Sequence, residues 1–303
     1  LELREGIVEI FRGIWPALMT PTAADHSVNL VALETLIDYL INKGVHGFYM
    51  GGTTGEGIFL SFTERQRLVE AALRRVNSRV PCIVHVGAVS VDDAVLLARH
   101  ARDHGAVGVS SILPPLYESL ESLRRYYSAI AEAVPELPLI TYILNPRIDS
   151  VAMMRALVDI PNLGGAKYTG PNMFEMRQII DMGAGQWTLF SGMDEQAIYG
   201  LMMGATGLVG STLNFMPGAY LSIDRHVREG RHQEAQDLQI RANRVTSAMI
   251  EVGFSGALKA ILSDLLKVDM GDPRLPSLPL NAEKRDLLRE KLAQTAFQAL
   301  AAL

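Results

Sequence analysis

The sequence is poor in the residues that cross-link small secreted proteins. Its 303 residues include one cysteine, Cys82, so we expect neither a disulfide framework nor a thiolate-rich metal site. A chain of this length buries enough apolar surface to fold without such links. We interpret Cys82 as a small buried residue of a β-strand, and a reducing cytoplasm as the simplest location.

Positive charge is scarce and scattered. The net charge is −5 and no block rich in lysine and arginine occurs, which argues against a nucleic-acid partner. The 28 basic residues include only six lysines. Because lysine is so rare here, the setting of each one is informative.

Long apolar runs are also missing. The stretch 196–223 carries no charge, but it holds five glycines and a proline, whereas a membrane span needs about 20 mostly apolar residues. We interpret it as a buried helix, a buried strand and the start of another helix, and we expect no membrane partner. Residues 1–12 contain several charges and no signal-peptide core, so we expect an exposed N-terminal extension and no export signal.

The sequence does contain a regular alternation of apolar β-like runs and amphipathic helix-like runs. Ser90 is expected to cap one helix, and Thr63 with Gln66 has the spacing of a capping box for another. Eight such units are what a closed barrel requires. We therefore predict an α/β fold, a (β/α)₈ TIM barrel over residues 13–218. Its expected strands are 14–19, 46–50, 82–86, 107–113, 139–144, 163–168, 187–190 and 207–211.

Beyond residue 218 the pattern is purely helical. Helices are expected at 220–227, 231–252, 256–266 and 282–302, with three prolines separating the last two. We therefore predict a C-terminal helical extension over residues 219–303.

Lys167 is the most informative candidate for chemistry. Active sites of such barrels lie at the carboxyl ends of the strands, and Lys167 belongs to the sixth expected strand, among small residues. Burying a charged lysine is costly, which favours the neutral amine that can attack a carbonyl and form a Schiff base. The alternative is a strand-end lysine that reaches solvent or a carboxylate. The other five lysines, however, are expected in helices or at helix ends.

Further candidates follow other strands. Gly52, Thr53 and Thr54 form a glycine-rich turn whose amides and hydroxyls could hold a carboxylate or phosphate. The alternative is an ordinary turn between a strand and a helix. Tyr117 and Tyr142 could move protons or merely pack.

Asp194 and Glu195 precede a helix after the seventh strand. The helix dipole stabilises acidic side chains at such a position, so one role for both residues is helix capping. The alternative role is binding of substrate hydroxyls. The seven histidines show no metal-ligand spacing in this interpretation, so no metal site is expected.

The turn Gly51–Glu56 combined with Lys167 resembles the dihydrodipicolinate synthase / N-acetylneuraminate lyase family, the class I Schiff-base pyruvate aldolases, over nearly the whole chain. The resemblance implies a barrel with a helical extension, usually a homotetramer built as a dimer of dimers. It implies 2-oxo acid and aldehyde substrates. It also implies that no cofactor is needed, because the lysine forms a covalent imine with the substrate.

The same resemblance implies residue roles. Lys167 would form the imine, Thr53 and Thr54 would bind the carboxylate, Tyr142 would move protons, and Tyr117 would complete the relay, often from a neighbouring subunit. Other substrate-binding positions would be Gly52, Thr169, Gly192, Asp194, Glu195, Ser211 and Arg147.

The substrate branch remains open at this point. The residues after the seventh and eighth strands resemble the N-acetylneuraminate lyase branch, which implies a sugar-acid-like 2-oxo compound. Thr53–Thr54 resembles the dihydrodipicolinate synthase branch, and Arg147 lies where synthases keep an arginine for the second substrate. A hydratase-aldolase or dehydratase also fits these residues, and so does a non-catalytic barrel that binds a 2-oxo acid.

Overall fold

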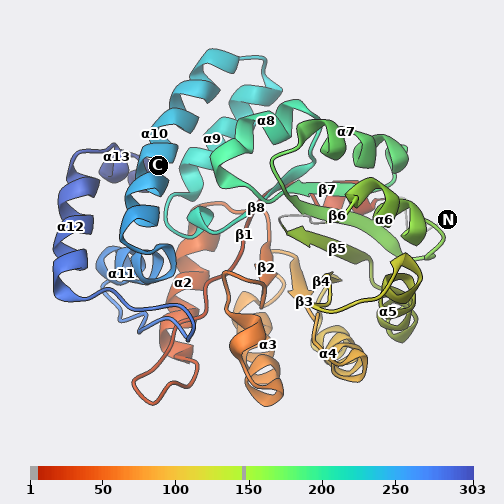
Figure 1. Cartoon of the computed structure of the whole chain (residues 1–303). Helices are drawn as coiled ribbons and strands as arrows, with labels where there is room; N and C mark the ends of the chain where they lie inside the picture. Colours follow the sequence, from red (N-terminus) through yellow and green to blue (C-terminus); the bar gives the residue numbers. More distant parts are fainter. Residues whose placement is uncertain (1–5, 145–147) are drawn as a thin grey trace.

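The computed structural model describes residues 6–144 and 148–303 as a barrel surrounded by helices (Figure 1). Eight parallel strands form one sheet in the order β1-β8-β7-β6-β5-β4-β3-β2. A bridge between Ala17 and Tyr49 joins the two ends of the sheet, so the barrel is nearly closed and the predicted fold is confirmed. The strands are β1 (Gly13–Pro16), β2 (Phe48–Met50), β3 (Cys82–His85), β4 (Gly108–Ile112), β5 (Leu139–Leu144), β6 (Leu163–Thr169), β7 (Thr188–Ser191) and β8 (Gly207–Gly210).

Helices follow the strands and cover the outside of the barrel. They are α2 (Leu30–Asn42), α3 (Phe62–Val76), α4 (Val91–Asp103), α5 (Leu120–Ala133), α6 (Ser150–Leu157), α7 (Met173–Met182), α8 (Ala197–Met202) and α9 (Pro217–Arg228). A short helix, α1 (Ile7–Ile10), precedes β1, and 3₁₀ turns follow β2, β7 and β8 as η1 (Gly57–Phe59), η2 (Asp194–Gln196) and η3 (Thr212–Asn214).

The C-terminal extension is helical, as predicted. It contains α10 (His232–Val252), α11 (Phe254–Leu266), α12 (Ala282–Ala293) and α13 (Phe297–Ala302), and Figure 1 shows these blue helices gathered on one side of the barrel. The single helix expected at 282–302 is therefore two helices. α9 begins at Pro217, so one helix crosses the boundary expected at residue 218. The limits of the barrel and the extension stay a prediction.

Two helix starts test the capping expectations. Ser90 caps α4 by accepting from Asp93 N, as predicted. The capping box of α3, however, is formed by Ser61 and Glu64, not by Thr63 and Gln66. Both pairs have the required spacing, but the backbone is extended at Ser61 and already helical beyond it, so the earlier pair forms the box.

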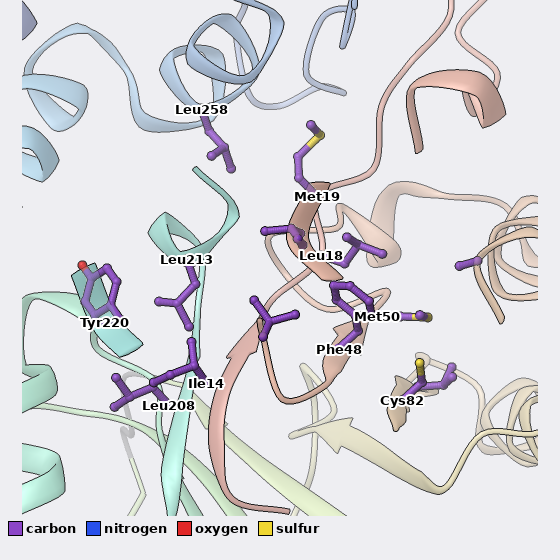
Figure 2. Close-up of a cluster of buried hydrophobic side chains, with 14 of the residues drawn as sticks. Ile14, Leu18, Met19, Phe48, Met50, Cys82, Leu208, Leu213, Tyr220 and Leu258 are labelled. Carbon is purple, nitrogen blue, oxygen red and sulfur yellow. The ribbon is translucent and has the colours of Figure 1, made fainter. Parts of the chain in front are cut away.

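The apolar residues form two clusters. The inner one holds side chains from most strands, including Trp15, Tyr142 and Phe190, and fills the barrel. The outer one lies between the sheet and the helices. Figure 2 shows part of it, with residues of β1, β2, β8 and α11 in the same cluster. Cys82 lies in the outer cluster as expected, and burial raises the pKa of its thiol to about 12.

Two further expectations concern apolar segments. Residues 196–223 form α8, β8 and the start of α9, as interpreted. In the described part of the chain, no single helix has the length and apolarity to cross a membrane. α10 and α11 have them only as a pair, which is bent by 116°.

The N-terminal extension is not wholly exposed. Phe11 is buried in the inner cluster, with its ring centroid 5.6 Å from that of Trp15.

Candidate active site

Lys167 faces the interior of the barrel. Its neighbours Ala166 and Tyr168 pack in the outer cluster, so the alternation of a strand turns Lys167 inward. The side chain is 4% exposed, and its Nζ lies 4.1 Å from the Tyr142 ring centroid and 4.8 Å from that of Tyr49. Within residues 6–144 and 148–303, Lys167 Nζ has neither an ion pair nor a hydrogen bond. The amine is therefore available for chemistry.

The small residues of β6 give this strand its shape. Gly165 has a φ of +130°, and a Cβ there would lie 1.9 Å from the carbonyl oxygen of Thr188. The pairing of β5 with β6 shifts register between Leu139 and Ile140. After this irregularity Lys167 is the register partner of Tyr142, so the local sequence of β6 sets the position of the lysine.

The glycine–threonine turn meets the same end of the barrel. Thr53 Oγ1 lies 3.4 Å from Tyr142 Oη, and Thr54 Oγ1 lies 2.6 Å from Ser211 Oγ. Gly52 packs so closely that a Cβ would lie 2.6 Å from the Tyr49 ring. The structure thus brings the turn, the β5 tyrosine and the serine after β8 together.

The C-terminal extension contacts this turn through a buried ion pair. Lys259 of α11 is 3% exposed and donates to Glu56 Oε2 at 3.1 Å, to Thr22 Oγ1 at 2.7 Å and to the Asp272 carbonyl at 2.9 Å. The second oxygen of Glu56 accepts from Arg274 N at 3.0 Å. Burial lowers the pKa of Lys259, and the charge of Glu56 opposes that shift.

A cavity lies between the turn and the extension. Its volume is about 300 Å³. Its polar lining comes from Thr53, Thr54, Glu56 and Ser211 on the barrel side and from Ser255, Lys259 and Ser277 on the extension side. The extension therefore forms a wall next to the site. The sequence does not predict this, because its pattern indicates Lys259 only as a helix lysine.

Thr169 and Gly192 lie beside the lysine. A Cβ on Gly192 would lie 1.9 Å from Thr169 Oγ1 and 3.0 Å from Lys167 Cε. The Thr169 hydroxyl is buried and has no hydrogen-bond partner among the described residues. An unpaired buried hydroxyl is costly, and this oxygen therefore has unused hydrogen-bonding capacity beside the lysine.

The Asp194 carboxylate is hydrogen-bonded within the protein. Its Oδ2 accepts from Thr212 N at 2.8 Å and from Thr212 Oγ1 at 2.7 Å, and burial raises its pKa to about 6. It opens η2 and not an α-helix. Glu195 follows, partly exposed, with its backbone carbonyl accepting from Asn243.

His85 is a neighbour of the lysine that the sequence interpretation missed. It is buried at the end of β3, where its Nε2 accepts from Ile112 N at 2.9 Å and its ring centroid lies 6.3 Å from that of Tyr142. Burial, with smaller effects of Arg65 and Lys167, holds the pKa of His85 well below its ordinary value. The imidazole is therefore neutral. A lone histidine on a strand gave no pattern that could have revealed it.

One predicted residue, Tyr117, is not brought to the site within the described residues. Tyr117 is 42% exposed after β4, and no hydrogen bond joins it to Thr53 or Tyr142 within the described residues; Leu116 beside it is 87% exposed. Arg147 lies outside the described residues. In the described part of the chain, the single grouping of possible metal ligands lies on α3 and α4, away from these strand ends.

Known proteins resemble this chain in sequence and in fold. Residues 10–295 match the family described as the dihydrodipicolinate synthetase family. The chain belongs to this family. It is 32% identical to an N-acetylneuraminate lyase of Danio rerio, with 94% of this chain and 96% of the relative covered. It is also 32% identical to an N-acetylneuraminate lyase of Rhizobium meliloti, with 93% and 94% covered.

A solved N-acetylneuraminate lyase has the same fold. The Proteus mirabilis N-acetylneuraminate lyase superposes with a TM-score of 0.90 at 32% identity, over 95% of this chain and 99% of that one. The resemblance inferred from the turn and Lys167 is therefore confirmed at the level of family and fold.

Proposed function

We propose that this protein is a Schiff-base lyase that releases or condenses pyruvate or a related 2-oxo acid. The observation that carries the proposal is Lys167, a buried amine free of ion pairs within the described residues, directly opposite Tyr142. Thr53, in contact with Tyr142, and Thr54 supply hydroxyls for the carboxylate. The substrate supplies the carbonyl, so no metal or organic cofactor is required.

The chemistry follows from an amine beside a tyrosine. Lys167 attacks C2 of the 2-oxo acid, and the carbinolamine loses water to give an imine. For cleavage, Tyr142 takes the proton of the C4 hydroxyl, the C3–C4 bond breaks, and an aldehyde leaves while the electron pair forms an enamine. The enamine takes a proton at C3. Water then hydrolyses the imine, releases pyruvate and restores the amine.

A sugar-acid-like 2-oxo compound is the proposed substrate class. The unpaired Thr169 hydroxyl, together with Gly192, Glu195 and Ser211, offers polar groups to a hydroxylated chain, and Asp194 fixes the loop through Thr212. The relatives named N-acetylneuraminate lyase support this choice. Thr53–Thr54 supports dihydrodipicolinate synthesis from pyruvate and aspartate semialdehyde as the second candidate.

A substrate panel tests the proposal. Pyruvate release is measured from N-acetylneuraminate and from 2-keto-3-deoxy sugar acids, beside condensation of pyruvate with aspartate semialdehyde. Release from a sugar acid supports the first candidate, whereas condensation alone supports the synthase. Loss of water from a sugar acid without release of an aldehyde would point to a dehydratase.

A barrel that binds 2-oxo acids without turnover is the alternative of another class. Exchange of the methyl protons of pyruvate with deuterated water separates the two, since exchange requires the enamine. Binding of pyruvate with no exchange would contradict the proposal.

The proposal includes a homotetramer in the cytoplasm. Tyr117 and Leu116 extend from the loop after β4, and we place Tyr117 in the site of a neighbouring copy, where it completes the proton relay. Light scattering gives the number of copies. Mixing Tyr117→Phe with Lys167→Ala chains tests the sharing, since mixed assemblies regain activity only if the tyrosine acts across copies.

A further inference from the structure

Two histidines and a glutamate meet on neighbouring helices outside the barrel. His100 lies in the last turn of α4, His104 caps that helix one turn later, and Glu70 faces them from α3. Glu70 Oε1 lies 3.0 Å from His100 Nε2 and 4.0 Å from His104 Nε2. The three possible ligand atoms all lie within 4.8 Å of one another.

A second contact orients one of the rings. His104 Nδ1 lies 2.8 Å from the His100 carbonyl oxygen. A carbonyl only accepts, so this Nδ1 carries the hydrogen and Nε2 keeps its lone pair on the side of Glu70. Metal-binding histidines are usually held in this way, with the second ring nitrogen donating to a carbonyl or carboxylate.

We propose that Glu70, His100 and His104 bind a divalent transition-metal ion, with Zn²⁺ as the best match. Bonds of about 2.1 Å to imidazole nitrogen and carboxylate oxygen place tetrahedral ligand atoms about 3.4 Å apart. The separations from Glu70 Oε1, 3.0 and 4.0 Å, lie on either side of that value. Small side-chain rotations suffice, and water would occupy the fourth position.

The ion would join α3 to α4, and the site is separate from the Schiff-base chemistry. The sequence interpretation found no metal-ligand spacing among the histidines. The available signal was the four-residue spacing of His100 and His104 on one helix face. The third ligand could not be found that way, because it comes from another helix.

Calorimetric titration of the chelator-treated full-length protein with ZnCl₂ tests the site. We expect one ion per chain. His100→Ala, His104→Ala and Glu70→Gln should each weaken binding by about tenfold or more. His232→Ala, which removes an exposed histidine at the start of α10, should bind like the wild type.

Thermal unfolding provides a second readout. An ion that binds the folded chain raises its midpoint, so Zn²⁺ should stabilise the wild type and His232→Ala more than His104→Ala. If the wild type takes up no Zn²⁺, or if the His100→Ala/His104→Ala double variant takes up as much, the proposal is wrong. Should His100→Ala fold poorly, His104→Ala, at the end of the helix, carries the same comparison.

Discussion

Lys167 and Tyr142 are register partners across β6 and β5, with the lysine nitrogen 4.1 Å from the tyrosine ring centroid. The tyrosine hydroxyl reaches Thr53 at 3.4 Å. One strand pair therefore carries both the proposed nucleophile and the proposed proton carrier, and a loop hydroxyl links the carrier to the turn that is proposed to bind the carboxylate.

Tyr142→Phe removes the proposed proton carrier while keeping the ring beside Lys167. Because general acid–base catalysis contributes about 10²–10⁴-fold, kcat for pyruvate release should fall by that factor. Steady-state kinetics on the best substrate of the panel give the value. Tyr39→Phe on α2 is the matched control and should retain wild-type activity. A Tyr142→Phe enzyme with unchanged kcat would remove the tyrosine from the mechanism.

Thr169→Val replaces the unpaired hydroxyl by a methyl group of similar size. If the hydroxyl binds the hydroxylated chain, its loss costs about 0.5–1.5 kcal/mol, or a roughly 2- to 12-fold lower kcat/KM for the sugar acid. Exchange of pyruvate methyl protons should be unchanged, since pyruvate lacks that chain. Thr35→Val on α2 is the control. Equal losses in both assays would show that Thr169 acts on the lysine and not on the second substrate.

The buried pair of Glu56 and Lys259 should couple the extension to the turn. Lys259→Met leaves the Glu56 carboxylate buried without its cation, and breaking such a pair costs about 3–5 kcal/mol of unfolding free energy. Adding Glu56→Gln should recover part of that loss. Urea unfolding of both single variants and the double variant measures the coupling. Additive losses would show that the two side chains act independently.

The same variants have a functional consequence. Since Thr53 and Thr54 lie on the turn that Glu56 anchors, the double variant should show a raised KM for pyruvate. Lys43→Met, at the far end of α2, is a control for loss of a lysine.

Asp194 should make stability depend on pH. Its folded pKa of about 6 lies above the ordinary value of 3.8, so the folded chain holds this proton more tightly than the unfolded chain does. The resulting stabilisation is full below about pH 4 and is lost as the pH rises to about 6. Asp194→Asn lacks it, so the variant should gain stability relative to wild type over that window, by up to about 3 kcal/mol.

Urea unfolding at pH 4, 5, 6 and 7 checks this trend. Asp92→Asn, at an exposed position of α4, should follow the wild type. A difference between wild type and Asp194→Asn that does not change with pH would contradict the assignment.

The sequence predicted the barrel well because its signals are local. Apolar runs bounded by glycine and proline gave all eight strands, and β5 lies at the predicted residues. The place of Lys167 on a strand was predicted as well, whereas its inward direction was left open against a solvent-facing alternative and came from the structure. Capping was less certain, because two overlapping pairs near α3 had the same spacing.

The missed features depend on residues far apart in the chain. Lys259 is buried because its partner Glu56 lies 203 residues earlier, and no local pattern reveals that pairing. The place of His85 beside Tyr49 and Tyr142 depends on the packing of β2, β3 and β5, so the sequence near His85 does not predict it. Phe11 is buried because it enters the barrel interior beside Trp15.

Reductive trapping tests the central claim most directly. The protein is incubated with pyruvate and sodium borohydride, digested, and analysed by mass spectrometry. We predict one reduced adduct per chain on the peptide containing Lys167, none on the peptide containing the other buried lysine, Lys259, and none in Lys167→Ala. No adduct in the wild type, or an undiminished adduct in Lys167→Ala, would contradict the account.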